Sequence, residues 1–427
     1  MKLFIIAPKW PEHSLWGQIY FRFPYLALTT LAALTGDDWD ISIVDENVKP
    51  LDFSDLPDLV AISAMTPLAK RAYEIADNFR SNGVQVVLGG IHPTMMKDEA
   101  KTHADAVVIG EAEEIWPQVL SDFKRGKLKP IYSALDFCSL DGLRFPKREL
   151  LNRKAYFFIN TIQTTRGCPF DCEFCSVTSF YGRTYRVRPV EEVVREVEHM
   201  GGGFVFFVDD NIVGKHAYAK ELFRALVPLN VKWFSQASLS IVKDGELLDL
   251  AQRSGCKGLF IGFESLSQEA LKAMGKSANR VEEYKEAIKI LHNHGIGIQG
   301  SFIFGTDQDD QSVFSDILRF IEKTHIEAAL FSVLTPFPGT RIQKVLSQQN
   351  RILHTDWEKY DMNHVVFRPK KMSPKQLQDG FNWAYKKLYG YRSIVKRLFP
   401  FTRSGLFYGI QNYGFRQAWK KTLNTPS

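Results

Sequence analysis

Residues 160–175 read NTIQTTRGCPFDCEFC and contain three of the five cysteines of the chain, Cys168, Cys172 and Cys175. The stretch 160–164 has the pattern of a short buried strand, so the three cysteines lie on the loop that follows it. In parallel α/β folds, ligands bind at the carboxyl ends of the strands. The sequence therefore predicts three thiols at the ligand-binding edge of a parallel sheet.

The spacing of these cysteines favours an iron-sulfur cluster. Three and then two residues separate them, so one loop can wrap a cubane and bind three of its irons, leaving the fourth iron open. An open metal position can bind a substrate, whereas a structural zinc site takes four protein ligands. The nearest downstream histidine, His199, is too distant in sequence to complete a zinc knuckle. A [4Fe-4S] cluster is the preferred interpretation, and structural zinc is the alternative.

The chain on both sides of this loop alternates strand and helix patterns. Before it, strands are predicted at residues 3–7, 41–45, 59–63, 84–90 and 106–110, which indicates a Rossmann-like, doubly wound parallel sheet. From residue 160 onward, six strands alternate with helices, as in an open (β/α)6 barrel. We therefore predict an α/β protein with a sheet domain at 1–135, a linker at 136–158, a partial barrel at 159–345 and a helical C-terminal region at 346–427.

The motif C-x3-C-x2-C, with aromatic Phe174 before its third cysteine, resembles the radical S-adenosylmethionine (SAM) superfamily. The resemblance implies a [4Fe-4S] cluster on Cys168, Cys172 and Cys175, with the amino and carboxylate groups of SAM on the open iron. It further implies that an electron from the cluster splits SAM to a 5'-deoxyadenosyl radical, which removes hydrogen from the substrate.

The same resemblance implies that SAM contacts the ends of the later barrel strands. The residues at these positions are Asp209, Asp210 and Asn211 after the second strand, Gln236 and Ser238 on the third, and Glu264 and Ser265 after the fourth. Their acidic, amide and hydroxyl groups suit an ammonium group and ribose hydroxyls. Two alternatives stay open: residues 209–211 can form an Asx-rich turn, and Glu264 can stabilise a helix N-terminus. No catalytic side chain is assigned.

The N-terminal sheet resembles the cobalamin-binding domain of the B12-dependent radical SAM class. Ser63 follows the third strand, and Gly89 and Gly90 end the next, where that class places the nucleotide tail of cobalamin. Small side chains at these positions leave a slot for a ligand. The stretch Asp-x-His-x-x-Gly, which supplies a histidine to cobalt in methionine synthase, is absent. An empty or nicotinamide-binding Rossmann domain is the alternative, although no G-x-G-x-x-G follows the first strand.

Residues 381–421 interleave aromatic with basic residues and contain no aspartate or glutamate. This composition is typical of a surface helix at an anionic membrane or of a nucleic-acid platform. The alternative is an amphipathic helical lid that packs its aromatic residues on the barrel. The net charge of +6 makes only a weak case for nucleic acid. Without a signal-peptide pattern or a long apolar run, the protein is expected in the cytoplasm, with association at a membrane surface through the C-terminal region.

The resemblance implies a radical SAM enzyme with a [4Fe-4S] cluster, SAM and cobalamin as cofactors. The leading hypothesis is cobalamin-dependent C-methylation of an unactivated carbon, with SAM as both radical source and methyl donor. Cyclisation, rearrangement or carbon-carbon coupling without methyl transfer is the alternative, and a cluster- or zinc-bearing RNA-binding protein is the rival from another class. The expected partners are a small-molecule or lipid substrate and a reducing protein such as flavodoxin or ferredoxin. The sequence names no substrate.

Overall fold

The computed structural model describes residues 1–20, 22–134, 136–157, 159–399 and 405–425. The chain forms two compact units. Unit 1 comprises Met1–Gly17, Arg22–Ile159 and the short return segment Asp356–Asp361, and unit 2 comprises Gln18–Phe21, Asn160–Thr355 and Met362–Ser427. The division into a sheet domain, a linker, a partial barrel and a helical C-terminal region, with the bounds given above, stays a prediction.

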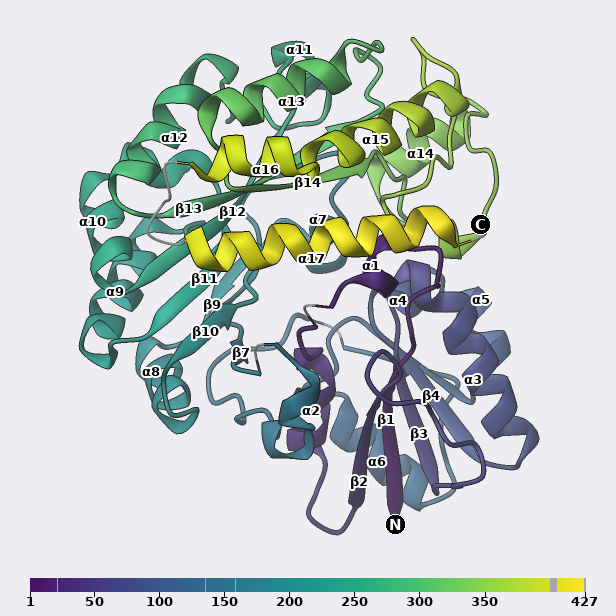
Figure 1. The fold of residues 1–427 in the computed structure, drawn as a ribbon. Coiled ribbons are helices and arrows are strands. Elements are labelled where there is room, and N and C mark those ends of the chain that lie inside the picture. The colour runs from purple at the N-terminus through teal and green to yellow at the C-terminus, as the bar shows by residue number, and fades with distance from the viewer. Residues whose placement is uncertain (21, 135, 158, 400–404, 426–427) are drawn as a thin grey trace. The chain divides into compact units, whose positions relative to one another are not determined.

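Unit 1 contains a six-stranded parallel sheet in the order β2-β1-β3-β4-β5-β6. Its strands are β1 Lys2–Ala7, β2 Asp40–Asp45, β3 Leu59–Ser63, β4 Gln85–Gly89, β5 Ala106–Ile109 and β6 Ile131–Ser133. Its helices are α1 Leu15–Gln18, which ends at the border with unit 2, α2 Leu26–Leu34, α3 Ala69–Ser81, α4 Ile91–Met95, α5 Lys97–His103 and α6 Trp116–Lys124 (Figure 1). Phe4 and Ile6 of β1 pack with residues of α3, whereas Leu3 and Ile5 pack with residues of α2 and α6. Helices cover both faces, as the apolar strands require.

Unit 2 contains a second six-stranded parallel sheet, in the order β14-β13-β12-β11-β10-β7. Its strands are β7 Thr161–Ile162, β10 Phe204–Phe207, β11 Lys232–Ala237, β12 Cys256–Glu264, β13 Gly297–Phe304 and β14 Ala328–Val333. The helices between them are α8 Val190–His199, α9 His216–Leu226, α10 Gly245–Arg253, α11 Gln268–Ala273, α12 Tyr284–Asn293 and α13 Val313–Thr324. The predicted α/β class, with a Rossmann-like sheet followed by an open barrel, is confirmed.

A small antiparallel hairpin, which the sequence did not predict, lies at the start of the cysteine loop. It pairs β8 Thr165–Gly167 with β9 Tyr185–Val187, and α7 Ser176–Tyr181 lies between the two strands. Gly167 has a φ of +86°, and a side chain there would collide with the backbone of Thr184. The glycine is therefore needed for the turn from the hairpin into the loop.

The C-terminal helices are α14 Arg341–Gln348, α15 Pro374–Leu388, α16 Tyr391–Leu398 and α17 Gly405–Asn424. Ser373 caps α15 and forms a capping box with Gln376. This helix covers the free edge of the sheet. The Tyr385 hydroxyl donates to the Phe331 carbonyl at 3.0 Å and accepts from the Phe331 amide at 3.2 Å, and the Tyr389 hydroxyl donates to the Ala329 carbonyl at 2.6 Å. Tyrosine hydroxyls thus satisfy backbone groups that an edge strand leaves unpaired.

Helix α17 crosses the sheet near the amino ends of β11, β12 and β13 (Figure 1). The Tyr408 ring lies so close to Gly258 and Gly297 that a side chain on either glycine would collide with it. Phe407 stacks on Phe234 of β11, with ring centroids 4.4 Å apart. These contacts place the first turn of α17 at the amino ends of these strands, opposite the carboxyl ends where ligands are expected.

Candidate cofactor-binding site

The three predicted cluster cysteines lie on one loop between β8 and α7. Cys172 is buried, whereas Cys168 and Cys175 are half-buried. The loop turns back on itself, because the Cys175 amide donates to the Cys172 carbonyl at 3.2 Å. Among the described residues, the cysteines do not form a group whose sulfur atoms all lie within 4.8 Å of one another. Three thiols on one loop suit the binding of different irons of a cubane.

A lysine that the sequence analysis missed lies beside these thiols. Burial raises the pKa of Cys172 to about 12, and the charge of Lys276 opposes this shift. The Lys276 ammonium pairs with the Glu264 carboxylate at 2.7 Å. Burial lowers the pKa of Lys276, but Glu264 and Cys172 outweigh this effect and raise it, so the lysine stays charged. The loop therefore faces a fixed positive charge, which favours thiolates and other anions.

Arg341 at the start of α14 clamps the cysteine loop. Its Nη1 donates to Asp171 Oδ1 at 2.6 Å, its Nη2 donates to the Asp171 carbonyl at 2.7 Å, and its Nε donates to Glu173 Oε2 at 2.9 Å. Asp171 and Glu173 are the sequence neighbours of Cys172. The guanidinium therefore holds the middle of the loop through hydrogen bonds to both neighbours of this cysteine. No sequence motif marks this arginine, because it lies far along the chain from the cysteines.

Asp209 and Asp210 lie next to the base of the loop. The buried Asp209 carboxylate accepts hydrogen bonds from the Thr164 amide at 2.8 Å, from the Thr165 amide, and from both threonine hydroxyls at 3.1 and 2.9 Å. Asp210 Oδ2 accepts from the Gly167 amide at 3.3 Å. Burial raises the pKa of Asp209 to about 6, and burial together with Asp209 raises that of Asp210 to about 7. The two carboxyl groups thereby tie the end of β10 to the start of the loop.

Asn211 connects the cysteine loop to the third barrel strand. Its side-chain amide donates to Cys168 Sγ at 3.9 Å, and its side-chain oxygen accepts from the Ser238 amide at 3.0 Å. Ser238 in turn shares a hydrogen bond of 2.8 Å with the Ser240 hydroxyl. Gln236, whose carbonyl accepts from the Ile212 amide at 2.9 Å, has a half-buried side chain. The predicted residues 209–211, 236 and 238 therefore lie in one region, at the carboxyl ends of β10 and β11.

Glu264 and Ser265 lie at the carboxyl end of β12. Glu264 is buried and has a φ of +64°, a conformation that non-glycine residues rarely adopt outside functional sites. Its carboxylate folds back over Gly262 toward Lys276. The Ser265 hydroxyl accepts from the Ser267 amide at 3.0 Å, which stabilises the turn before α11. The contacts of all these side chains with SAM stay predictions.

The predicted cobalamin residues lie together at the carboxyl edge of the sheet in unit 1. Ser63 pairs with Gly89 across β3 and β4. Gly90 has a φ of +99°, and a side chain there would meet Ala64 and the Ser63 hydroxyl. A side chain on Gly110, after β5, would meet nothing within 4 Å. The strand order reverses between β1 and β3, and ligands of such sheets bind at this switch point.

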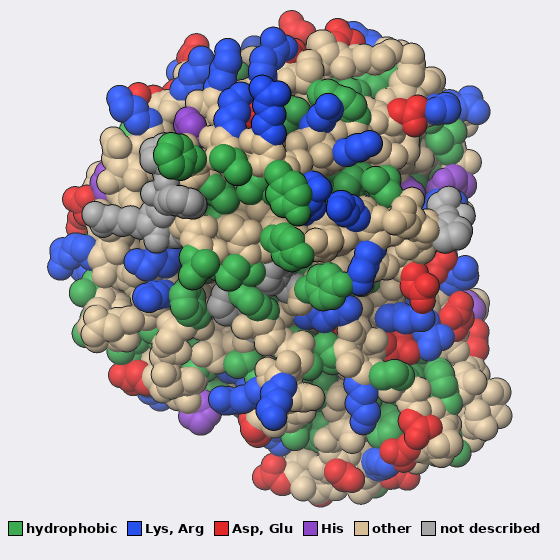
Figure 2. Space-filling model, in the orientation of Figure 1, with side chains coloured by type: hydrophobic (Ala, Val, Ile, Leu, Met, Phe, Trp, Pro, Cys, Tyr) green, Lys and Arg blue, Asp and Glu red, His purple; other side chains and the backbone are tan. Residues whose placement is uncertain are grey.

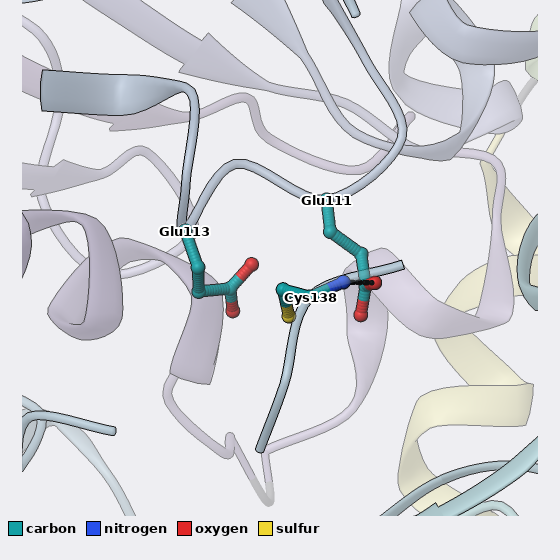
Figure 3. Close-up of side chains that lie close together, drawn as sticks. All are labelled: Glu111, Glu113 and Cys138. Atoms are coloured by element: carbon teal, nitrogen blue, oxygen red, sulfur yellow. Dashed lines mark hydrogen bonds between the residues drawn. The ribbon is translucent and has the colours of Figure 1, made fainter. Parts of the chain in front are cut away.

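Next to this edge, Glu111 and Glu113 lie close to Cys138, with ligand atoms within 4.8 Å of one another (Figure 3). The Glu111 carboxylate accepts a hydrogen bond from the Cys138 amide at 3.0 Å. Glu111 therefore anchors the segment around Cys138 to the end of β5. The cysteines outside the loop, Cys138 and Cys256, are both buried, and burial raises the pKa of the Cys256 thiol.

Comparisons with known proteins agree with both units. The family model described as the radical SAM superfamily matches residues 162–321, and the B12 binding domain matches residues 14–120. Bacteriochlorophyllide d C-12(1)-methyltransferase from Chlorobaculum tepidum is 37% identical over 386 residues, which are 87% of this chain and 84% of that protein. Bacteriochlorophyllide d C-8(2)-methyltransferase from the same organism is 31% identical over 394 residues, which are 87% of each chain.

Among solved structures, the fold is similar to that of the radical SAM methyltransferase TsrM from Kitasatospora setae, determined with cobalamin and a [4Fe-4S] cluster bound. The TM-score is 0.66 at 18% identity, over 82% of this chain and 78% of that one. The predicted family and its B12-dependent class are confirmed by these matches. The chain belongs to the radical SAM superfamily, in the class that carries a B12-binding domain.

Proposed function

We propose that this protein is a cobalamin-dependent radical SAM methyltransferase that methylates an unactivated carbon of an apolar small molecule. The observation that carries the proposal is similarity over most of the chain to two methyltransferases, combined with a three-cysteine loop at the carboxyl edge of the barrel. The rival hypothesis of an RNA-binding protein does not account for this similarity.

In this proposal Cys168, Cys172 and Cys175 hold a [4Fe-4S] cluster, which when bound and reduced splits SAM and supplies the radical. The half-buried Lys276 ammonium, which pairs with Glu264 at 2.7 Å and lies near the Cys172 thiol, offers a positive charge that can bind a carboxylate. Glu264 and the cluster of Asp210, Asn211 and Ser238 offer the acceptors that an ammonium group and ribose hydroxyls need. Asp209 is proposed to position the cysteine loop, because its carboxylate accepts hydrogen bonds from Thr164 and Thr165.

Ser63, Gly89 and Gly90 are proposed to hold the nucleotide tail of cobalamin, which when bound carries the methyl group. Space supports this assignment: a side chain on Gly89 would meet only the Cβ of Val108, at 3.8 Å, and Gly110 faces open space. Gly89 and Gly110 thus leave backbone that a large ligand can approach closely.

The substrate proposed first is a tetrapyrrole with alkyl substituents, because both relatives are named for bacteriochlorophyllide d. A lipid remains the second substrate class. A flavodoxin or ferredoxin as electron donor, a cytoplasmic location and peripheral association with a membrane stay predictions. Cyclisation, rearrangement or coupling without methyl transfer is the alternative reaction.

A labelling experiment separates these reactions. The reconstituted protein is incubated anaerobically with dithionite, bacteriochlorophyllide d and SAM labelled in its methyl group. Methyl transfer predicts three products: 5'-deoxyadenosine, S-adenosylhomocysteine and a labelled pigment. Formation of 5'-deoxyadenosine with an altered but unlabelled pigment would support the alternative reaction, and an unchanged pigment would exclude this substrate.

A further inference from the structure

Helices α15 to α17 expose an unusual number of large apolar side chains on one face of unit 2. We call this face the outer helical surface; it consists of Trp383, Tyr391, Val395, Phe399, Leu406, Ile410 and Tyr413. Figure 2 shows hydrophobic side chains gathered over α16 and α17, with lysine and arginine side chains around them. The exposed fractions are large, at 64% for Val395 and 81% for Leu406. Patches of this kind mark interaction sites.

The sequence spacing of these residues places them on the solvent-exposed faces of α16 and α17, whose other faces already pack on the rest of unit 2. On α16 and at its end, exposed apolar residues recur every four positions, at Tyr391, Val395 and Phe399. On α17, Leu406, Ile410 and Tyr413 follow the same helical period. The opposite face of α17 is buried through Tyr408 and other aromatic residues, so the interpretation that the tail packs its aromatic residues on the barrel holds for these residues.

A buried arginine holds α16 and α17 together, so the outer helical surface is preformed. The Arg397 guanidinium donates to Asn412 Oδ1 at 2.7 Å, to the Leu388 carbonyl at 2.9 Å and to the Glu327 carbonyl at 2.5 Å. Breaking these contacts would leave a buried charge without partners. The helices therefore present their apolar faces without rearrangement.

Basic side chains surround the apolar residues. Lys386, Arg392 and Lys420 are exposed and make no ion pair among the described residues. The Arg416 guanidinium lies over the Tyr391 ring, 4.0 Å from its centroid. Lys396 pairs with Glu322 of α13 at 2.8 Å, and Asp379, one turn before Trp383 on α15, pairs with Lys375. Residues 381–421 themselves contain no aspartate or glutamate. The charge of the surface is complementary to an anionic partner.

We propose that the outer helical surface docks on an anionic lipid bilayer, with α16 and α17 lying parallel to the membrane plane. Helices with exposed apolar side chains and flanking lysine and arginine bind membranes in this way, through apolar burial and attraction to anionic lipid. No described helix is long and apolar enough to span the bilayer. Docking would bring the enzyme to apolar substrates that partition into lipid.

Vesicle sedimentation tests the proposal with the full-length protein, without SAM or substrate, so the result is independent of the proposed chemistry. We expect binding to vesicles of phosphatidylcholine with phosphatidylglycerol, weak binding to pure phosphatidylcholine, and loss of binding as salt rises. Arg392→Glu should weaken binding about 25-fold, because it changes the net charge by two and each charge near the surface is worth about a factor of five. Leu406→Ser with Ile410→Ser should weaken binding on the order of a hundredfold.

Val345→Ser is the matched control, because Val345 is an exposed apolar residue of unit 2 outside this surface, with 41% exposure. It should leave vesicle binding unchanged. Arg392 is exposed, so Arg392→Glu should not disturb the fold. This variant keeps the test valid if the double serine variant unfolds. Equal binding to neutral and anionic vesicles, or full binding by both test variants, would overturn the proposal. A dimer in sedimentation velocity that Leu406→Ser with Ile410→Ser dissociates, without vesicle binding by the wild type, would instead assign the surface to a second copy of the chain.

Discussion

Replacing Arg341 by alanine should weaken the hold of the protein on its cluster while leaving the fold intact. The change removes the three side-chain hydrogen bonds of Arg341 to Asp171 and Glu173, on either side of Cys172, and keeps the hydrogen bond from the Ile342 amide to the Glu173 carbonyl. The cysteine itself and its neighbours are not altered. We therefore expect a loop that samples more conformations and binds the cluster less tightly.

The magnitude follows from the exposure of the pair. Hydrogen bonds between charged groups contribute about 1.5–3 kcal/mol when buried, and exposed pairs contribute roughly 0–1 kcal/mol. The Arg341, Asp171 and Glu173 side chains are 42%, 24% and 35% exposed, so each contact lies near the lower range. Together they should stabilise the closed loop by about 2 kcal/mol, or roughly thirtyfold in cluster affinity.

The assay follows loss of the cluster absorption under anaerobic conditions after addition of an iron chelator. Arg341→Ala should lose its cluster about ten- to thirtyfold faster than the wild type, and Arg341→Lys should lie between the two because lysine keeps the charge but not the forked geometry. Arg319→Ala, which removes a surface pair with Asp316 on α13, is the control. Identical rates for Arg341→Ala and the control would refute a role of Arg341 in loop order.

Three further outcomes are expected. Asn211→Ala removes the hydrogen bond to Cys168 Sγ, so a spectroscopically monitored redox titration should give a more negative cluster potential, and an unchanged potential would contradict this. Tyr385→Phe leaves the buried amide and carbonyl of Phe331 without this partner, so denaturant unfolding should show a loss of about 1–3 kcal/mol. Burial holds the pKa of His92 below its usual value, so below about pH 6.5 the unfolded chain binds a proton that the folded chain does not, and stability falls. The thermal midpoint of His92→Gln should fall less than that of the wild type between about pH 7 and pH 5, and an equal fall would disprove the role of His92.

The parts of the fold that were predictable have strong periodic signals. Buried parallel strands such as β1, β3 and β4 are short runs rich in apolar residues between helical patterns, and they lie where the sequence analysis placed them. The hairpin of β8 and β9 was missed because each strand has three residues, too few for a period of two to be seen. The edge strand β6, which also has three residues, was missed for the same reason.

The cysteine loop was predictable because its spacing is itself the chemical signal. The groups that support the loop were not, since Lys276 and Arg341 lie in segments without a motif and reach it only through the folded chain. The sequence left two roles open for Asp209, a contact with SAM or a place in a local turn. In the structure its carboxylate accepts hydrogen bonds from Thr164 and Thr165, which precede the cysteine loop. Residues Asp356–Asp361 belong to unit 1 although the chain before and after them belongs to unit 2. This assignment depends on tertiary packing, so no local sequence pattern predicts it.

The most direct test of the central claim is one anaerobic preparation. The wild-type protein and Cys172→Ser are reconstituted with iron, sulfide and hydroxocobalamin, and then assayed with dithionite and SAM for 5'-deoxyadenosine. The account predicts iron-sulfur and corrinoid absorption in the wild type, with 5'-deoxyadenosine formed by the wild type and not by Cys172→Ser. Absence of 5'-deoxyadenosine from a wild-type protein that carries its full cluster, or equal amounts from the variant, would contradict the account.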